Sequence, residues 1–221
     1  MLDVEGNADH TVLVGAVTLA FFFLLRGGEY LCHDGGDFDR NKALRGADIT
    51  FWKDGKTVKW GRDAPEVSIR LRSSKADIFN AGASRNHFRS GSKLCAVEAL
   101  ARIQERFPER FGDGEEAMLP LFRLSDGSPV LRSMVQDLIQ QAAVAVGLPP
   151  ARYATHSLRI GGACALLHAG MSVELIQRWG RWASQAFQAY LWESPEDARG
   201  VAAKMIQSPS SLSVTRNLRG G

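Results

Sequence analysis

Residues Thr155 to Tyr190 read THSLRIGGACALLHAGMSVELIQRWGRWASQAFQAY, and this stretch contains the pattern that decides the fold. Thr155 is a favourable helix N-cap, and residues Ile160 to Leu167 are good helix formers with one apolar face. Gly170 is typical of a helix end, because glycine adopts the left-handed conformation there without strain. The first half of the stretch therefore predicts one short helix.

Two further short helices follow in the same stretch. Ser172 predicts the cap of the second helix, which runs to about Trp179. A corner at Gly180 to Trp182 separates it from a third helix, which Ser184 caps and which carries Tyr190. The three helices would bring several polar side chains within reach of one another.

Four of these side chains are not usual choices for a protein core. His156 and Arg159 are three positions apart near the start of the first helix, so they share one face. Trp182 stands in the corner, and Tyr190 lies on the third helix. Core packing alone explains Trp182, and an ordinary helix position alone explains Tyr190, so their order along the chain is the informative feature.

This order resembles the catalytic core of the tyrosine recombinases, the phage-integrase family. That family carries His-x-x-Arg, then Gly-His or Gly-Trp further along, then a nucleophilic tyrosine; the matching residues here are His156, Arg159, Gly180 with Trp182, and Tyr190. The form Gly-Arg-Trp-Ala-Ser…Ala-Phe…Tyr is most similar to eukaryotic transposon-encoded members. Trp182 precedes Tyr190 by eight positions, one fewer than in many bacterial and phage members.

The longest apolar run, Val12 to Leu25, predicts a buried helix from about Thr11 into the cluster Phe21 to Phe23. Because a bilayer span needs about 20 residues, the run is too short to cross a membrane. Acidic residues precede it where a signal peptide would carry basic ones. The polar residues Met1 to Asp9 predict a frayed end.

Arg26 follows this run, so its charge must leave the core or be paired. Glu29 lies three residues on, and an ion pair at a helix end is the ordinary interpretation. The sequence Leu-Leu-Arg-Gly-Gly-Glu-Tyr resembles the first-arginine motif of the tyrosine recombinases. The resemblance implies that Arg26 binds the scissile phosphate and that Glu29 supports it.

Three β-rich segments indicate a small antiparallel sheet: Ala47–Trp52, Thr57–Gly61 and Val67–Arg72. Asp54-Gly55 is typical of a two-residue hairpin turn. Apolar and polar residues alternate from Val67 to Arg72, which predicts one buried face and one basic face. Asn86–Arg89 is a candidate return strand.

The segment from Lys53 to Lys93 contains ten lysines or arginines against four acidic residues, in a chain of net charge +3. Such a segment indicates a surface that faces a polyanion, although a solvated hairpin explains it equally well. The arginines that we take as DNA-binding candidates are Arg70, Arg72, Arg85 and Arg89.

Lys75 stands in the context Ser-Ser-Lys-x-Asp. By position it matches the lysine that the family carries on a β-hairpin, so the resemblance implies that Lys75 protonates the leaving 5′ oxygen. The alternative is a solvated hairpin lysine. The resemblance also implies that Tyr190 attacks the phosphate, forming a 3′-phosphotyrosyl linkage that a 5′-hydroxyl later resolves without ATP, metal or another cofactor.

The remaining roles follow from side-chain chemistry. Arg26 and Arg159 suit the non-bridging phosphate oxygens, because a guanidinium donates two parallel hydrogen bonds and keeps its charge. His156 could donate to the same phosphate or handle the proton of the nucleophile. The indole of Trp182 is a donor only.

Other segments complete the expected architecture. Ser92 caps a helix from Lys93 to Phe107, and Ser128-Pro129 opens a helix to Val146. A surface loop is expected from His33 to Arg45, with no metal site. Ser194 starts a last helix to about Ile206, with one apolar face. The resemblance implies that this helix docks on a neighbouring subunit.

The expected fold class is mixed, mainly α with a small antiparallel β-sheet: the tyrosine recombinase catalytic-domain fold. We expect a catalytic domain over residues 1–206, a flexible tail over 207–221, and no N-terminal core-binding domain. Three cysteines without paired spacing argue against disulfides and zinc and fit an intracellular compartment, nuclear in a eukaryote and otherwise cytoplasmic or nucleoid.

The expected function is site-specific DNA cleavage and rejoining, with double-stranded DNA and a homotetramer on DNA as partners and no membrane. A type IB topoisomerase-like enzyme shares this chemistry and is the first alternative. A catalytically silent DNA-binding module derived from a recombinase is the second, and a helical protein-interaction domain is the third. A covalent adduct with nicked DNA would separate the enzymes from the other two.

Overall fold

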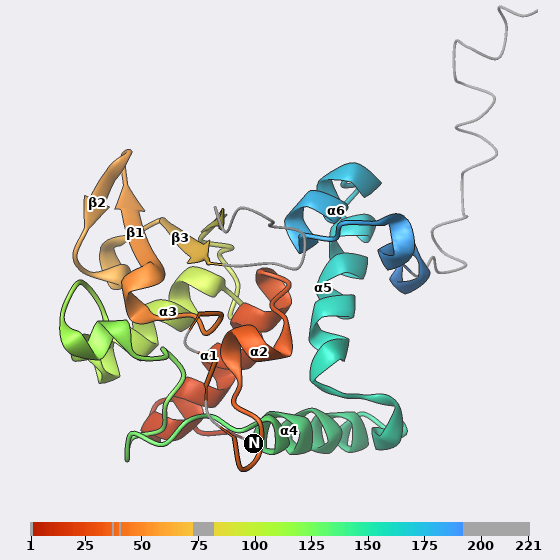
Figure 1. Ribbon diagram of the computed structural model, residues 1–221, viewed down its shortest axis with the longest axis horizontal. Coiled ribbons are helices and arrows are strands. Elements are labelled where there is room, and N and C mark those ends of the chain that lie inside the picture. Colours follow the sequence, from red (N-terminus) through yellow and green to blue (C-terminus); the bar gives the residue numbers. More distant parts are fainter. Residues whose placement is uncertain (1, 37, 40, 73–81, 192–221) are drawn as a thin grey trace, which may run out of the picture.

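The computed structural model describes residues 2–191, apart from 37, 40 and 73–81 (Figure 1). The α-helices are α1 (Ala8–Phe22), α2 (Gly27–Tyr30), α3 (Ala96–Arg106), α4 (Arg132–Ala145), α5 (Thr155–His168) and α6 (Val173–Gly180). The 3-10 helices are η1 (Gly46–Asp48), η2 (Gly61–Asp63), η3 (Pro108–Arg110), η4 (Glu115–Met118), η5 (Pro150–Arg152) and η6 (Gln185–Tyr190).

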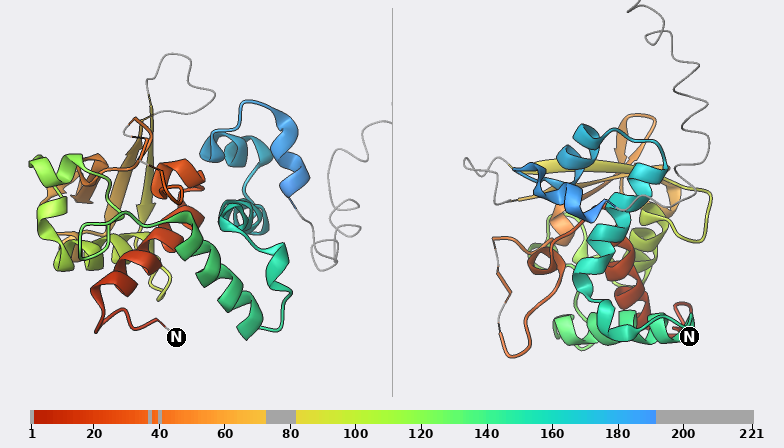
Figure 2. Two further views of the ribbon diagram at one scale, coloured as in Figure 1. Left: turned by 60° about the horizontal axis from the view of Figure 1, so that its bottom comes forward. Right: turned by 90° about the vertical axis from the view of Figure 1, so that its right-hand side faces the viewer.

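One four-stranded antiparallel sheet accompanies the helices. Its strands are β1 (Ile49–Lys53), β2 (Lys56–Val58), β3 (Glu66–Leu71) and β4 (Ala83–Phe88), in the order β2-β1-β3-β4. Figures 1 and 2 show α1 in the middle, with the sheet and α3 on one side and α5 and α6 on the other. The predicted class, mainly α with a small antiparallel sheet, is confirmed.

Helix α1 is the centre of the core, as its apolar run predicted. Val12, Ala16 and Leu19 are fully buried. The helix begins at Ala8 rather than Thr11, because Asn7 caps it: Asn7 Oδ1 accepts hydrogen bonds from the backbone N–H groups of Asp9 at 2.9 Å and His10 at 3.1 Å. The last residues of the segment that we expected to fray therefore belong to the helix.

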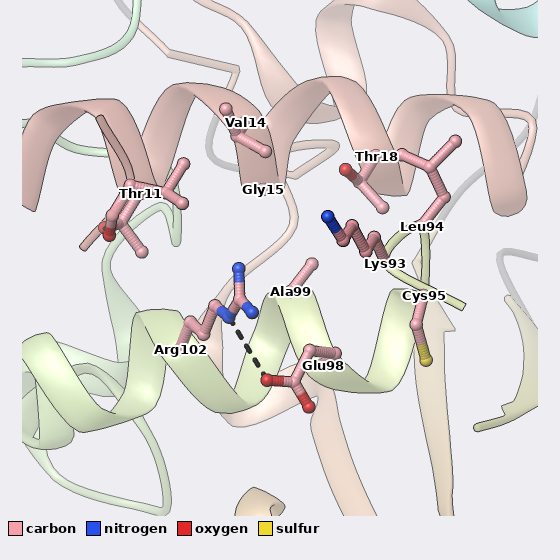
Figure 3. Close-up of a pocket in the computed structure, with 11 residues that line it drawn as sticks. Thr11, Val14, Gly15, Thr18, Lys93, Leu94, Cys95, Glu98, Ala99 and Arg102 are labelled. Atoms are coloured by element: carbon pink, nitrogen blue, oxygen red, sulfur yellow. Dashed lines mark hydrogen bonds and ion pairs between the residues drawn. The ribbon is translucent and has the colours of Figure 1, made fainter. Parts of the chain in front are cut away.

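Small residues let α1 and α3 approach closely. A Cβ added at Gly15 would lie 2.4 Å from Ile103 Cδ1, so the end of the Ile103 side chain fills the space that glycine leaves. Figure 3 shows Gly15 of α1 and Ala99 of α3 facing each other across a small pocket of about 40 Å³. This contact joins the central helix to the layer beneath the sheet.

Apolar and polar residues alternate along β3, and the predicted buried face and basic face are both present. Val67 and Ile69 are fully buried and Leu71 nearly so, whereas Arg70 is exposed. Asp54 and Gly55 have φ angles of 52° and 72°, as the tight turn between β1 and β2 requires. Strand β2 ends before the predicted Gly61, because the N–H of that residue donates to Gln104 Oε1 at 2.7 Å on α3.

His87 of β4 joins the two sides of the molecule. Its ring packs edge-on against Phe23, with centroids 4.6 Å apart, and against Trp179 of α6 at 5.4 Å. Its Nε2 lies 2.8 Å from the carbonyl oxygen of Phe22, which assigns the proton to that nitrogen. The end of α1 is thereby held between β4 and α6.

Two predicted helix starts are wrong. Helix α4 begins at Arg132 rather than Ser128, because the residues before it are extended. Val130 donates its N–H to Phe122 O at 3.1 Å and accepts one from Cys32 at 3.0 Å. Helix α3 begins at Ala96 with Cys95 as N-cap, not at Lys93 after a Ser92 cap. Long-range backbone pairing in the first case overrides a local capping signal.

Smaller shifts of helix boundaries occur between Thr155 and Tyr190. Ala154, not Thr155, is the N-cap of α5, and Ser172 caps α6 as predicted, accepting from Leu175 N at 3.2 Å. The helix expected from Ser194, the tail 207–221 and Lys75 lie outside the described residues. Within the described ranges, no helix combines the length and apolarity that a membrane crossing needs.

Candidate active site

A sharp turn after α1 presents Arg26. Leu24, which is 1% exposed, adopts a φ of 50° and reverses the chain, so Arg26 becomes the N-cap of the short helix α2. Glu29 accepts a hydrogen bond from the Arg26 backbone N–H at 2.8 Å and contacts its Nη1 at 3.3 Å. The ion pair expected from the sequence is therefore present.

Arg181 shares the same carboxylate from the other end of the chain. It occupies the corner after α6 with a φ of 58°, and its Nη2 donates to Glu29 Oε2 at 2.7 Å. Both side chains are 4% exposed. Arg26 in turn donates from Nη2 to the Arg181 carbonyl oxygen at 2.8 Å. Two arginines from distant segments are thus locked around one buried Glu29.

Arg159 of α5 closes the group from a third segment. Its guanidinium, 2% exposed, donates to the carbonyl oxygens of Leu24 and Gly180. Its central carbon lies 4.3 Å from the ring centroid of Trp182. Arg159 therefore faces the protein interior and ties the turn after α1 to the corner after α6. We refer to Arg26, Glu29, Arg159 and Arg181 as the arginine cluster.

The arginine cluster carries excess positive charge. Glu29 is the one carboxylate that the described residues bring into ion pairs with Arg26 and Arg181. Arg181 Nε and Nη1 are buried and have no hydrogen-bond partner among the described residues. Burial lowers the pKa of Arg181 to about 10, and Glu29 opposes that shift. Because buried charge is costly unless it is paired, this arrangement favours an anion as an additional ligand.

Trp182 anchors the helix that ends at Tyr190. Its ring stacks on Phe187 of η6 with centroids 5.0 Å apart and planes at 18°. Phe187 is 1% exposed and belongs to a small apolar cluster with Leu24 and Ile176. The structure describes Tyr190 through its backbone alone, at the end of η6. The backbone of η6 is thereby fixed, through Trp182, to Arg159.

His156 lies at the start of α5 and is exposed. Partial burial lowers its pKa first, and the positive charges of Arg159 and Arg132 lower it further. A neutral imidazole offers one donor and one acceptor, so His156 suits proton transfer at neutral pH.

The four DNA-binding candidates have different surroundings. Arg70 is exposed on β3, and Arg72 donates from Nε and Nη2 to Asp48 Oδ1, both at 2.9 Å. Arg85 donates to the Arg178 carbonyl and packs 5.9 Å from the Trp179 ring centroid.

Arg89 is the fourth candidate, and its guanidinium is engaged within the fold. It donates to Ala64 O at 2.7 Å and to Gly61 O at 2.9 Å, and it pairs with Glu98. Arg85 and Arg89 thus hold the sheet to its neighbours, and Arg70 has the most open position of the four.

Arg181 is the residue that our interpretation of the sequence missed. It follows Gly180 directly and precedes Tyr190 by nine positions, whereas Trp182 precedes it by eight. The longer spacing is the one that many bacterial and phage tyrosine recombinases have. A spacing of nine positions before Tyr190 was therefore the sequence signal for Arg181, which the structure places beside Arg26 and Glu29.

The described part of the chain contains no group of three or more histidine, cysteine or acidic side chains that could hold a metal ion. No protein-family model matches the sequence, and no curated protein matches it either.

Solved structures do match. The XerH site-specific recombinase bound to palindromic difH substrate, a post-cleavage complex, aligns with 91% of this chain and 47% of its own at 15% identity and a TM-score of 0.60. The pre-cleavage complex of XerH with difH aligns with 89% of this chain and 47% of its own, at 14% identity and a TM-score of 0.56. XerA recombinase aligns with 88% of this chain and 57% of its own, at 18% identity and a TM-score of 0.56. The chain spans about half the length of these proteins, and at such identities the likeness concerns the fold.

Proposed function

We propose that this chain, which has the tyrosine recombinase catalytic-domain fold, cleaves and rejoins double-stranded DNA through a covalent 3′-phosphotyrosyl intermediate. The observation that carries the proposal is the arginine cluster. Two guanidinium groups pair with one carboxylate, and a third, that of Arg159, is bonded to the carbonyl oxygens of the two segments that carry them. Within the described part of the chain, two nitrogens of Arg181 have no hydrogen-bond partner. A phosphodiester would supply the missing negative charge.

Each residue has a role in this proposal. Arg26 and Arg181 would bind the non-bridging oxygens of the scissile phosphate, and Glu29 would hold the two guanidinium groups at a fixed spacing. Tyr190 would attack phosphorus, so that the bond to the 5′ oxygen breaks and the phosphate joins the phenol oxygen. His156 would accept the phenol proton, and Lys75 would protonate the leaving oxygen. Such fixed donors are typically worth about 3–4 kcal/mol each in a transition state.

Arg159 requires a conformational step before it can join this chemistry. Its guanidinium nitrogens already donate hydrogen bonds to the carbonyl oxygens of Leu24 and Gly180, and the residue is 2% exposed. The buried nitrogens of Arg181 need the same step. We propose that DNA binding moves the corner at Gly180, which exposes Arg181 and releases Arg159 toward the phosphate. Residues 1–206 would form the catalytic unit, and subunits would assemble on DNA.

A second candidate function follows from the same observation. If Arg159 stays on its carbonyl partners when DNA binds, the chain would act as a catalytically silent DNA-binding module. That candidate predicts phosphate contacts from Arg26 and the basic segment without strand cleavage.

One experiment separates the two candidates. The chain is incubated with nicked suicide duplexes that trap a cleaved strand, and covalent adducts are resolved on a denaturing gel. The proposed function predicts an adduct in the parent chain and none in Tyr190→Phe, which retains the aromatic ring and should still bind DNA. Tyr153→Phe is the matched control and should form the adduct. Binding without any adduct would support the silent module.

A further inference from the structure

A pocket of about 270 Å³ opens where three helices begin. Gly27 and Gly28 open α2, Arg132 opens α4, and His156 lies in the first turn of α5; His33 completes the polar lining. None of the described residues that line the pocket is acidic. The pocket adjoins the arginine cluster along the chain, because Gly27 follows Arg26 directly.

We propose that this pocket binds a second phosphate group of the DNA strand, next to the one held by the arginine cluster, through Arg132, His33 and His156. The inference rests on the proposed function and extends it to a subsite. Arg132 would supply the fixed charge, and the two imidazoles would supply hydrogen-bond donors.

The side chains that would make these contacts are accessible. Arg132, His33 and His156 are all exposed, so a ligand can reach them without opening the core. Two hydrogen bonds fix the rim: the backbone N–H of Arg132 donates to Cys32 O at 2.8 Å, and the side-chain hydroxyl of Ser133 donates to the carboxylate of Asp34 at 2.6 Å. The carboxylate of Asp34, the residue that follows His33, therefore accepts a hydrogen bond from Ser133.

The pocket also has the electrostatics and the size for a phosphate group. Helices α4 and α5 both begin at it. The positive end of the α5 dipole adds to the charge of Arg132, whereas the start of α4 already faces the Asp34 carboxylate through Ser133. A guanidinium matches two phosphate oxygens at once. Because a water molecule takes roughly 30 Å³ of liquid, the pocket exceeds the space of a single solvent molecule several times.

The two glycines keep the pocket open. A Cβ added at Gly27 or Gly28 would meet no atom of the described residues within 4 Å, and neither residue has a positive φ. Alanine should therefore be tolerated by the fold, and its methyl group would occupy space that the phosphate needs.

The test measures binding of an uncleaved duplex at several salt concentrations, in a Tyr190→Phe chain so that cleavage does not interfere. Arg132→Gln should reduce the slope of log affinity against log salt by about 0.9, the contribution of one phosphate contact. Arg152→Gln is the matched control: it removes one charge from an exposed position on η5, outside the pocket, and should leave the slope unchanged. Gly28→Ala should weaken binding several-fold without loss of thermal stability.

Equal slopes for Arg132→Gln and Arg152→Gln, or full affinity in Gly28→Ala, would overturn the proposal. The ring resonances of His33 and His156 supply a direct readout by NMR. They should move on addition of a short duplex; movement with inorganic phosphate but not with the duplex would assign the pocket to free phosphate and also overturn the proposal. A parent chain that binds DNA normally but forms no adduct would instead count against the proposed function alone.

Discussion

Glu29 and Arg181 form an ion pair of 2.7 Å between side chains that are each 4% exposed, although 152 positions separate them in the sequence. The same carboxylate contacts Arg26. Glu29 is therefore the residue that joins the turn after α1 to the corner after α6, and both ends of the proposed phosphate site depend on it.

Glu29→Gln should destabilise the fold strongly. The amide keeps the shape of the side chain but leaves the charge of Arg181 buried and unpaired, at a cost of about 3–5 kcal/mol in the free energy of unfolding. Chemical denaturation measures this value. Lys42→Gln, which removes an exposed ion pair with Asp39, is the control and should cost about 1 kcal/mol or less. Similar losses in both variants would show that the Glu29 pair is not special.

Arg181 should matter more for cleavage than the indole N–H of Trp182. Arg181→Lys keeps the charge but removes the unpartnered Nε and Nη1, so we expect cleavage to fall by about two to three orders of magnitude. Trp182→Phe keeps an aromatic ring against Phe187 and Arg159 and should have a smaller effect. Single-turnover cleavage on a suicide substrate measures both, and the opposite ranking would return the role to Trp182.

Gly162 and Gly161 offer a matched pair on α5. A Cβ at Gly162 would lie 2.2 Å from Phe21 O and 2.5 Å from Leu24 Cδ2, so Gly162→Ala should cost about 1–3 kcal/mol. A Cβ at Gly161 would lie 3.6 Å from the Phe21 ring, an ordinary contact, and Gly161→Ala should gain about 0.5–1 kcal/mol from helix propensity. Thermal unfolding of both variants tests the packing of α5 on the end of α1.

His87 should make stability depend on pH. Burial lowers its pKa in the folded state, and the hydrogen bond to the Phe22 carbonyl opposes this shift. The unfolded chain then takes up a proton more readily, so the contribution of His87 is present above about pH 6.5 and is lost as the pH falls below that value. The difference in unfolding free energy between pH 7.5 and 5.5 should shrink in His87→Gln. An unchanged difference would assign the dependence to other groups, such as His156.

Lys75→Ala should lose cleavage on an ordinary substrate and regain it on one with a bridging sulfur at the 5′ position. A thiolate leaves without the proton that an alkoxide requires. Lys59→Ala, a lysine change elsewhere in the basic segment, should cleave both substrates equally. The absence of preferential rescue in Lys75→Ala would remove Lys75 from the acid role.

The sequence by itself determined the parts of the fold that depend on local patterns. The apolar run after Thr11 specified the central helix, because no other placement buries so many adjacent side chains. Alternation from Val67 specified β3. Asp54-Gly55 specified the hairpin between β1 and β2, since few residues tolerate two successive positive φ angles. The order of His156, Arg159 and Tyr190 along the chain was sufficient for the predicted fold class.

Only the tertiary structure decided which side chains meet. Several contacts join segments that are distant in sequence. Glu29 pairs with Arg181, and Arg159 donates to the carbonyl oxygens of Leu24 and Gly180. Arg89 donates to the carbonyl oxygen of Ala64. The same holds for the true start of α4, where the backbone hydrogen bond from Cys32 to Val130 outweighs the Ser128-Pro129 signal. Local propensity is worth a fraction of a kilocalorie per residue, whereas a buried charge or backbone group left unpaired costs several. The final arrangement therefore follows the long-range partners.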